Sequence, residues 1–127
     1  MKIAGGVAVS LLALVALFQL ALALGAPFGK AAWGGAHSGV LPTRLRLASA
    51  VTGVLVYPAI ILIVLSSTRL IDADLVPGNS SAAMWILAVL FVVGTLANAV
   101  SRSPMERWWA PVSLAIAICC AVVATSG

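Results

Sequence analysis

Four apolar stretches, each about as long as a lipid bilayer is thick, constrain this chain more than any other feature. A membrane-spanning helix needs about 20 predominantly apolar residues. The seven basic and three acidic side chains all lie outside these stretches, which cover residues 3–24, 47–65, 82–100 and 109–125. We therefore predict an all-α fold, a membrane four-helix bundle with four transmembrane helices, forming a single integral membrane domain over residues 1–127.

The composition leads to the same class of protein. Hydrophobic residues make up 63% of the 127 residues and charged residues 8%, and the mean hydropathy is +1.20. A soluble domain carries roughly 25% charged residues, so a water-soluble enzyme, a disulfide scaffold and a disordered chain are all excluded. The first stretch resembles a secretory leader, but its apolar part exceeds the usual length of about 7–15 residues, so we expect a retained helix.

Local signals mark the helix ends. Gly25 followed by Pro27 is typical of a helix C-terminus. Residues 103–106 have the spacing of a capping box with proline at the first helical position, which predicts that the fourth helix begins before its apolar part. Two prolines fall inside helices: Pro58 should bend the second, and Pro111 should kink or restart the fourth.

The distribution of charge predicts the orientation. With four crossings, both termini and the middle connection share one side, which carries two basic residues, Lys2 and Arg69. The first and third connections carry five, namely Lys30, Arg44, Arg46, Arg102 and Arg107. The positive-inside rule then puts those connections in the cytoplasm and both termini outside. Topology thus accounts for the pI near 9.8, and no nucleic-acid partner is expected.

The polar residues inside the apolar stretches are the first candidates for a site. Under this orientation Gln19 and Asn98 fall in the inner third of the membrane, level with Ser113. They either form interhelical hydrogen bonds that hold the bundle together or line a polar cavity open to the cytoplasm. The candidate cavity residues are Gln19, Tyr57, Thr95 and Asn98.

A second set of candidates lies on the predicted cytoplasmic face, namely Trp33, His37, Arg44, Arg102 and Glu106. His37 and Glu106 are the one pair that could act as acid and base, but the capping position already explains Glu106. His37 has no neighbouring ligand cluster, and the adjacent Cys119 and Cys120 match no zinc spacing. We expect no catalytic site, no metal and no cofactor, and two cysteines that act as small buried side chains.

Two groups of residues carry a family resemblance. The first runs from Leu24-Gly25-Ala26-Pro27 through Ala32-Trp33-Gly34-Gly35 to His37, Leu41-Pro42 and Arg44; the second comprises Asn98, Ser101-Arg102-Ser103 and Glu106-Arg107. Together they resemble a pattern found in small four-helix bacterial integral membrane proteins of unassigned function. The resemblance covers most of the chain. It implies a bacterial cytoplasmic membrane and shared elements at the cytoplasmic face, and it implies no mechanism.

Three functions fit the sequence. The first is a non-catalytic integral membrane protein that acts through helix packing, as a homo-oligomer or as an accessory subunit of a membrane complex. Small residues four apart support it: Gly6 with Ser10, Ser49 with Gly53, and Ser113, Ala117, Ala121 and Thr125. The alternative is a passive transporter, channel, or lipid- or small-molecule-binding protein with an inward-facing polar cavity. The third is a membrane enzyme that uses His37 and Glu106.

The predicted partners follow from these readings. All three include the lipid bilayer; the first adds a second copy or another membrane protein, and the second adds a lipid or small hydrophobic ligand. Because no Asp, Glu, Lys, Arg or His lies in a predicted membrane core, proton antiport is disfavoured.

Overall fold

The computed structural model describes residues 1–37, 39–76, 80–101 and 103–126. Within these ranges, four helices are long and apolar enough to cross a membrane: Lys2–Ala23, Thr43–Ser67, Ser80–Ala99 and Pro104–Ser126. The predicted all-α, four-span fold is therefore confirmed, and the chain is an integral membrane protein. The second and fourth spans begin earlier than their apolar stretches do, because polar first turns extend both helices.

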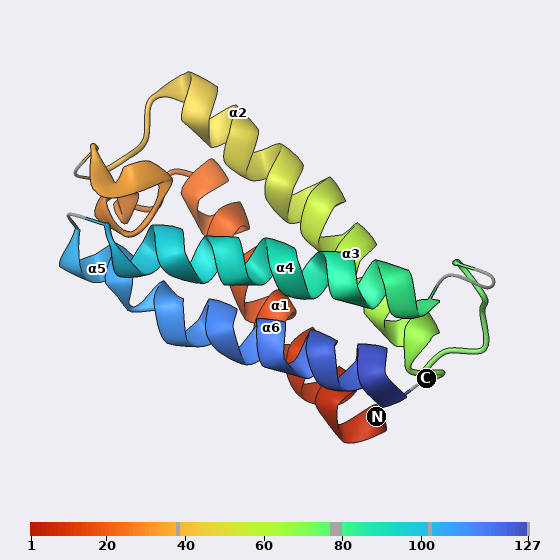
Figure 1. The fold of residues 1–127 in the computed structure, drawn as a ribbon. Coiled ribbons are helices and arrows are strands. Elements are labelled where there is room, and N and C mark those ends of the chain that lie inside the picture. The colour runs from red at the N-terminus through yellow and green to blue at the C-terminus, as the bar shows by residue number, and fades with distance from the viewer. Residues whose placement is uncertain (38, 77–79, 102, 127) are drawn as a thin grey trace.

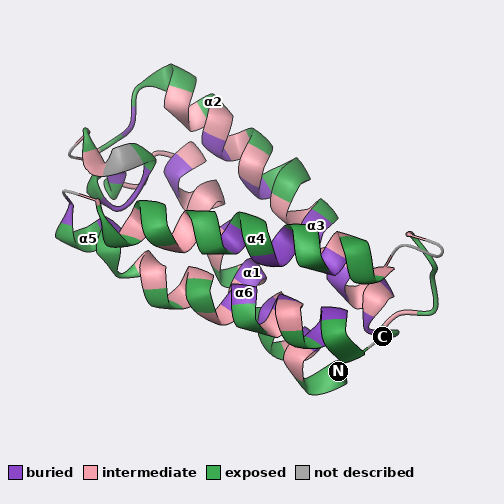
Figure 2. Cartoon of the chain, viewed as in Figure 1, coloured by how far each residue is buried: buried purple, intermediate pink, exposed green. Residues whose placement is uncertain are grey.

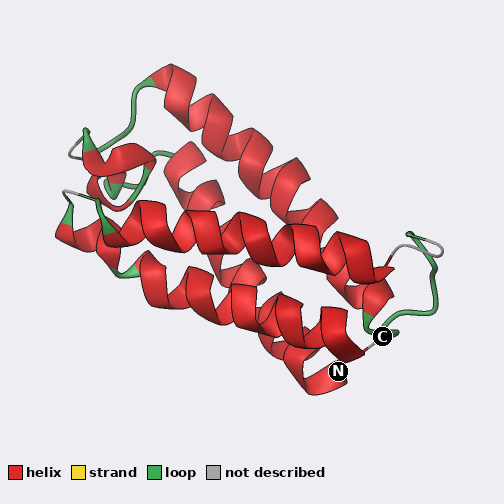
Figure 3. Cartoon of the chain, viewed as in Figure 1, coloured by secondary structure: helices red, strands yellow, loops and turns green. Residues whose placement is uncertain are grey.

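The first span is α1 (Lys2–Ala23). It contacts α2 (Thr43–Val51) and α3 (Tyr57–Ser67) of the second span, and it also contacts α6 (Trp109–Ser126). The third span, α4 (Ser80–Ala99), packs most extensively on α6. Both termini lie at one end of the bundle with the connection that follows α3, and the other two connections lie at the opposite end (Figures 1 and 3).

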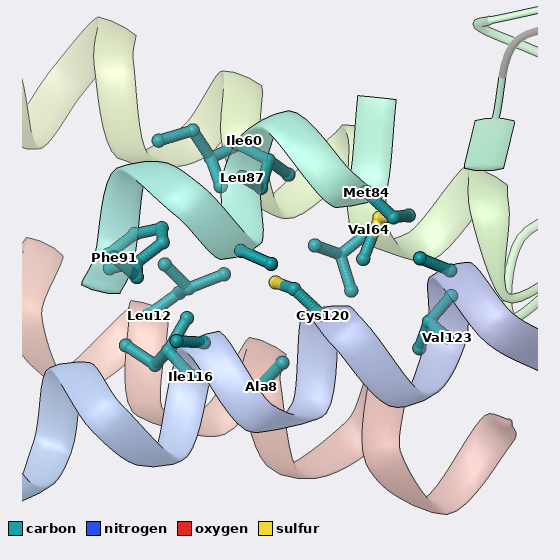
Figure 4. Close-up of a cluster of buried hydrophobic side chains, with 13 residues drawn as sticks. Ala8, Leu12, Ile60, Val64, Met84, Leu87, Phe91, Ile116, Cys120 and Val123 are labelled. Atoms are coloured by element: carbon teal, nitrogen blue, oxygen red, sulfur yellow. The ribbon is translucent and has the colours of Figure 1, made fainter. Parts of the chain in front are cut away.

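The apolar core lies between α1, α3, α4 and α6 (Figure 4). Its buried members are Ala8, Leu12, Ile60, Val64, Met84, Leu87, Ala88, Phe91, Ile116, Ala117, Cys120, Val123 and Ala124. Cys120 is fully buried here, as expected, whereas Cys119 is only partly buried against the core, and both cysteines are free. Exposed residues cover much of the outward faces of the helices (Figure 2). Many of these exposed residues are leucines and valines. In a membrane such faces contact lipid.

The C-terminal end of α1 is closed as predicted. Gly25 adopts a φ of 102°, and its N–H donates to the Leu22 carbonyl at 3.1 Å. The Ala26 N–H donates to the Ala21 carbonyl at 2.9 Å, which completes a Schellman motif. The guanidinium of Arg46 donates to the Ala23 carbonyl at 3.2 Å. A positive charge at this end complements the helix dipole.

The second span changes its hydrogen-bonding pattern just before Pro58. Over η3 (Thr52–Val56) the helix is a π-helix, and the Tyr57 N–H donates to the Thr52 carbonyl, five residues back. Pro58 has no N–H to donate to the Val54 carbonyl, so an α-helical turn cannot be completed there. The distortion predicted at Pro58 is therefore a widened turn, which brings Thr52 and Tyr57 close to the same side of the helix.

The fourth span begins at Pro104, in the short helix α5 (Pro104–Arg107), and restarts at Trp109. Both the early start and the restart near Pro111 are confirmed. Each proline lies in the first turn of a helix, where proline is tolerated. The prediction of a capping box at residues 103–106 is wrong. Ser103 is the N-cap residue, but its side chain makes no capping hydrogen bond, and its hydroxyl donates to the Lys30 carbonyl of the first connection.

That first connection, residues 24–42, we call the cap loop. Apart from residue 38, which lies outside the described ranges, it folds through two 3₁₀ turns, η1 (Gly29–Ala31) and η2 (Trp33–Gly35). The Gly29 N–H donates to the Gly39 carbonyl at 2.8 Å. Ala32 and Leu41 are buried with Leu22 of α1 in a second, smaller apolar cluster. The cap loop is thus packed against one end of the bundle, beside α5 (Figure 1).

Candidate functional site

A cavity of about 280 Å³ lies where the cap loop meets the helices. All four spans and the cap loop contribute to its wall. Apolar side chains such as Val15 and Ile116 form part of the wall. The polar side chains that line it are Gln19, Thr52, Tyr57, Asn98, Glu106 and Ser113. Small-molecule sites commonly combine a mostly apolar wall with a few polar groups in this way.

Three of the four candidate cavity residues come together in this wall: Gln19 from α1, Tyr57 from α3 and Asn98 from α4. The fourth, Thr95, is not among the lining residues. Its hydroxyl donates to the Phe91 carbonyl of its own helix at 2.7 Å. A threonine inside a helix often satisfies its hydroxyl in this way, and the sequence alone did not show which face of α4 it occupies.

The amide of Gln19 is the most unusual group in the wall. Its Oε1 atom is buried and has no hydrogen-bond partner among the residues that the structure describes. The interhelical contact considered for Gln19 and Asn98 is not formed, since the Asn98 Nδ2 instead donates to the Ser113 hydroxyl at 3.5 Å. A buried carbonyl without a partner destabilises a protein by about 1–3 kcal/mol. A hydrogen-bond donor in the cavity would remove that penalty.

Two of the predicted cytoplasmic-face candidates, Trp33 and Glu106, also line the cavity, whereas His37 and Arg44 do not, and Arg102 lies outside the described residues. Glu106 is only 7% exposed. Because His37 is absent from the wall, the cavity does not bring together the acid–base pair of the enzyme hypothesis.

The backbone at Trp33 is strained. Its φ of 51° lies in the left-handed region, which destabilises a non-glycine residue by about 1–2 kcal/mol. The indole N–H donates to the hydroxyl of Ser49 at 2.9 Å, and Ser49 is fully buried in α2. This hydrogen bond helps to hold the Trp33 ring at the cavity wall.

The sequence analysis missed several aromatic wall residues. Phe18 and Trp109 line the cavity, and their ring centroids lie 4.8 Å apart with planes inclined at 47°. Phe91 lines it as well. The Trp108-Trp109 pair was a signal for Trp109, because neighbouring residues in a helix point in different directions. Trp108 is 78% exposed, so Trp109 is the ring that lines the cavity. One ring of such a pair faces the bundle when the other faces lipid.

A wider depression of about 790 Å³ lies at the opposite end, between the ends of the helices and the connection after α3. Its charged side chains, Arg69, Asp72 and Asp74, are exposed, as expected of a solvated turn. No group of three His, Cys, Asp or Glu side chains among the described residues could hold a metal ion. The depression also contains Arg69, whose φ is 57°, and Ser67, whose buried hydroxyl has no hydrogen-bond partner among the described residues.

Three energetically unfavourable features coincide at the smaller cavity: the π-helical turn η3, the left-handed backbone of Trp33 and the unpaired carbonyl of Gln19. Such features gather at functional sites, because elsewhere selection removes them. The larger depression has two features of this kind, at Ser67 and Arg69, but the cavity beneath the cap loop has all three and gathers polar side chains from all four spans, so it is the candidate site. Comparisons of the chain with protein-family models, with curated proteins and with solved structures find no match.

Proposed function

We propose that this protein binds a small amphipathic molecule in the cavity beneath the cap loop. The observation that carries the proposal is the buried, unpaired Oε1 atom of Gln19 in a wall that also holds Asn98 and Tyr57. Buried polar atoms nearly always have a partner in folded proteins, so a ligand with an N–H or O–H group is the natural one here.

The size of the cavity limits the ligand. Sites for small molecules measure about 300–1,000 Å³, and this cavity of about 280 Å³ stands at the lower end of that range. It suits a single ring with a short polar arm, or one polar headgroup, rather than a whole two-chain lipid. Because the wall includes the ends of α1 and α4, the ligand would sit near the membrane surface.

The charge distribution also predicts which side of the membrane the site faces. The cavity lies at the end of the bundle that carries the first and third connections, which hold five of the seven basic residues. Under the positive-inside rule we propose that this end faces the cytoplasm and that both termini lie outside. The resemblance to small bacterial membrane proteins implies that the cell is bacterial.

Action through helix packing, as an oligomer or an accessory subunit, stays a prediction. Its sequence support included the small-residue stripe on the fourth span, and the chain uses part of that stripe internally. Ala117 is buried in the core, and a Cβ atom at Gly94 of α4 would lie 3.8 Å from the Ser113 hydroxyl. Helix packing does not explain the unpaired Gln19 carbonyl, and the proposed binding function does.

Native mass spectrometry of the protein released gently from its own membrane tests the proposal. We expect a discrete small-molecule adduct on the wild type and on the control Thr95→Val, which alters a hydroxyl outside the cavity. In Gln19→Leu the retained adduct should fall by about tenfold or more, since a hydrogen bond to a buried group is lost.

Thermal unfolding supplies the complementary readout. Gln19→Leu removes an unpaired buried amide, so its melting temperature should equal or exceed that of the wild type. Loss of the adduct without loss of stability would identify Gln19 as a binding residue. A wild type that carries no adduct, or a Gln19→Leu variant that retains it fully, would refute the proposed function.

A further inference from the structure

We propose that the ligand is a phenol, an aromatic ring that carries its own hydroxyl, and that this ring packs against Trp33. This inference rests on the proposed function and names the chemical class that the cavity would take. The aromatic content of the wall and the way in which the fold holds Trp33 support the ring. The unpaired Gln19 carbonyl, which carries the proposed function, supports the hydroxyl.

Aromatic side chains are concentrated in the cavity wall. The chain has three phenylalanines, one tyrosine and four tryptophans. Five of these rings line this one cavity, and each comes from a different element: Phe18, Trp33, Tyr57, Phe91 and Trp109. Aromatic rings in contact attract one another through their edges and faces, beyond the effect of the area that they bury. A wall with rings from several helices and the cap loop therefore favours an aromatic ligand over a saturated one of the same size.

Among these rings, Trp33 is held in the most specific way. Its backbone lies in the left-handed region at a φ of 51°, and its indole N–H donates to the buried Ser49 hydroxyl at 2.9 Å. A glycine would adopt this backbone without strain, yet the sequence places a large ring there. The side chain is still 41% exposed, so part of its surface is available to a ligand. Because the ring also lines the cavity, we assign its purpose to the ligand.

A ring hydroxyl suits the polar part of the wall. The buried Oε1 atom of Gln19 needs a donor, and a phenolic O–H, with a pKa of about 10, is a stronger donor than the O–H of a saturated alcohol. No lysine, arginine or histidine is found among the described residues that line the cavity, and Glu106 already has a partner within the protein. The wall therefore gives a ligand no reason to carry a charge, and a phenol is neutral at pH 7.

The experiment compares 4-methylphenol with trans-4-methylcyclohexanol, which share the hydroxyl and the methyl group and differ in the ring. Binding is measured by equilibrium dialysis against the full chain in nanodiscs of zwitterionic lipid, with empty nanodiscs subtracted. We expect the phenol to bind about tenfold more tightly than the cyclohexanol. A third probe, 4-methylanisole, keeps the aromatic ring but has no O–H, and it should bind about tenfold more weakly than the phenol. These comparisons need only the wild type.

Variants then assign the preference for the aromatic ring to Trp33. Trp33→Gly removes the ring and suits the left-handed backbone, so the cap loop should stay folded, which hydrogen exchange across residues 29–41 checks. The preference for the phenol over the cyclohexanol should fall to about threefold or less. The control Phe28→Leu removes an exposed ring of the same loop that does not line the cavity, and it should leave the preference intact. Gln19→Leu should weaken both alcohols, because both donate to its carbonyl.

The outcomes separate the two proposals. If the cyclohexanol binds as tightly as the phenol, or if Trp33→Gly with a folded loop keeps the full preference, the phenol assignment is refuted while the binding function stands. If 4-methylanisole binds as tightly as the phenol, the hydroxyl makes no hydrogen bond in the cavity and the assignment fails as well. If no probe binds, the assignment is again refuted, and the native adduct on Gln19→Leu decides the binding function on its own.

Discussion

We expect Gly5→Ala to destabilise the bundle by about 1–3 kcal/mol, whereas the same substitution at the neighbouring Gly6 should not. A Cβ atom at Gly5 would lie 2.5 Å from the Cγ2 atom of Thr68 and 3.0 Å from its hydroxyl. Thr68 is fully buried at the end of α3, and its hydroxyl donates to the Val64 carbonyl at 2.8 Å. The side chain therefore has little freedom to move, and α1 and α3 would have to separate.

Gly6 provides the matched control. A Cβ atom there would have no neighbour within 4 Å, so Gly6→Ala should be neutral or stabilise α1 by up to about 1 kcal/mol, the usual gain from replacing a helical glycine. Thermal or denaturant unfolding in detergent micelles measures both variants. A Thr68→Ser change, which deletes the Cγ2 atom, should recover part of the loss in Gly5→Ala. Equal stabilities of the two alanine variants would contradict the close α1–α3 contact.

This pair of glycines shows what sequence patterns determine and what they leave open. The four spans could be predicted because each depends on about 20 consecutive residues and on no distant contact. The four-residue spacing indicated Gly6 with Ser10 as a packing pair, but it is Gly5 that approaches α3 closely. Adjacent helical positions differ by about 100° in direction, and only the placement of the partner helix decides which one is used.

The candidate site was predictable to a similar extent. Gln19, Tyr57 and Asn98 stood out because a polar side chain in an apolar helix needs a reason, and all three line the cavity. The position of Glu106 depends on contacts between α5 and the cap loop, which join residues far apart in the sequence. The capping-box pattern suggested a local role for Ser103, whereas the hydroxyl bonds to the Lys30 carbonyl. Tertiary contacts of this kind leave no periodic signal.

Among substitutions in the cap loop, we expect Gly29→Ala to destabilise the loop most. A Cβ atom there would lie 2.5 Å from the His37 carbonyl oxygen and 2.7 Å from that of Gly39. Both are backbone atoms, so no side-chain rotation can relieve the clash, and the hydrogen bond from the Gly29 N–H to Gly39 would break. We expect the substitution to reduce the stability of the closed loop by about 3 kcal/mol, the upper end of the usual range for overpacking.

The loss should be local. Ala32 and Leu41 pack in the small cluster around Leu22, separate from the main core between the helices, so the four spans can stay assembled while the loop opens. Hydrogen exchange should therefore accelerate about a hundredfold across residues 29–41, with much smaller changes in α4 and α6. The control Ala36→Val adds more volume at an exposed position and should leave exchange unchanged.

Ligand binding connects this prediction to the site, because Ala31, Ala32 and Trp33 form the side of the cavity that the loop supplies. Gly29→Ala should lower the amount of the native small-molecule adduct, because the apparent affinity scales with the fraction of molecules whose loop is closed. Saturating ligand should in turn slow exchange in the loop, since a ligand that binds only the closed form stabilises it. If exchange accelerates while binding is unchanged, the cap loop is packed on the bundle but forms no functional part of the cavity wall.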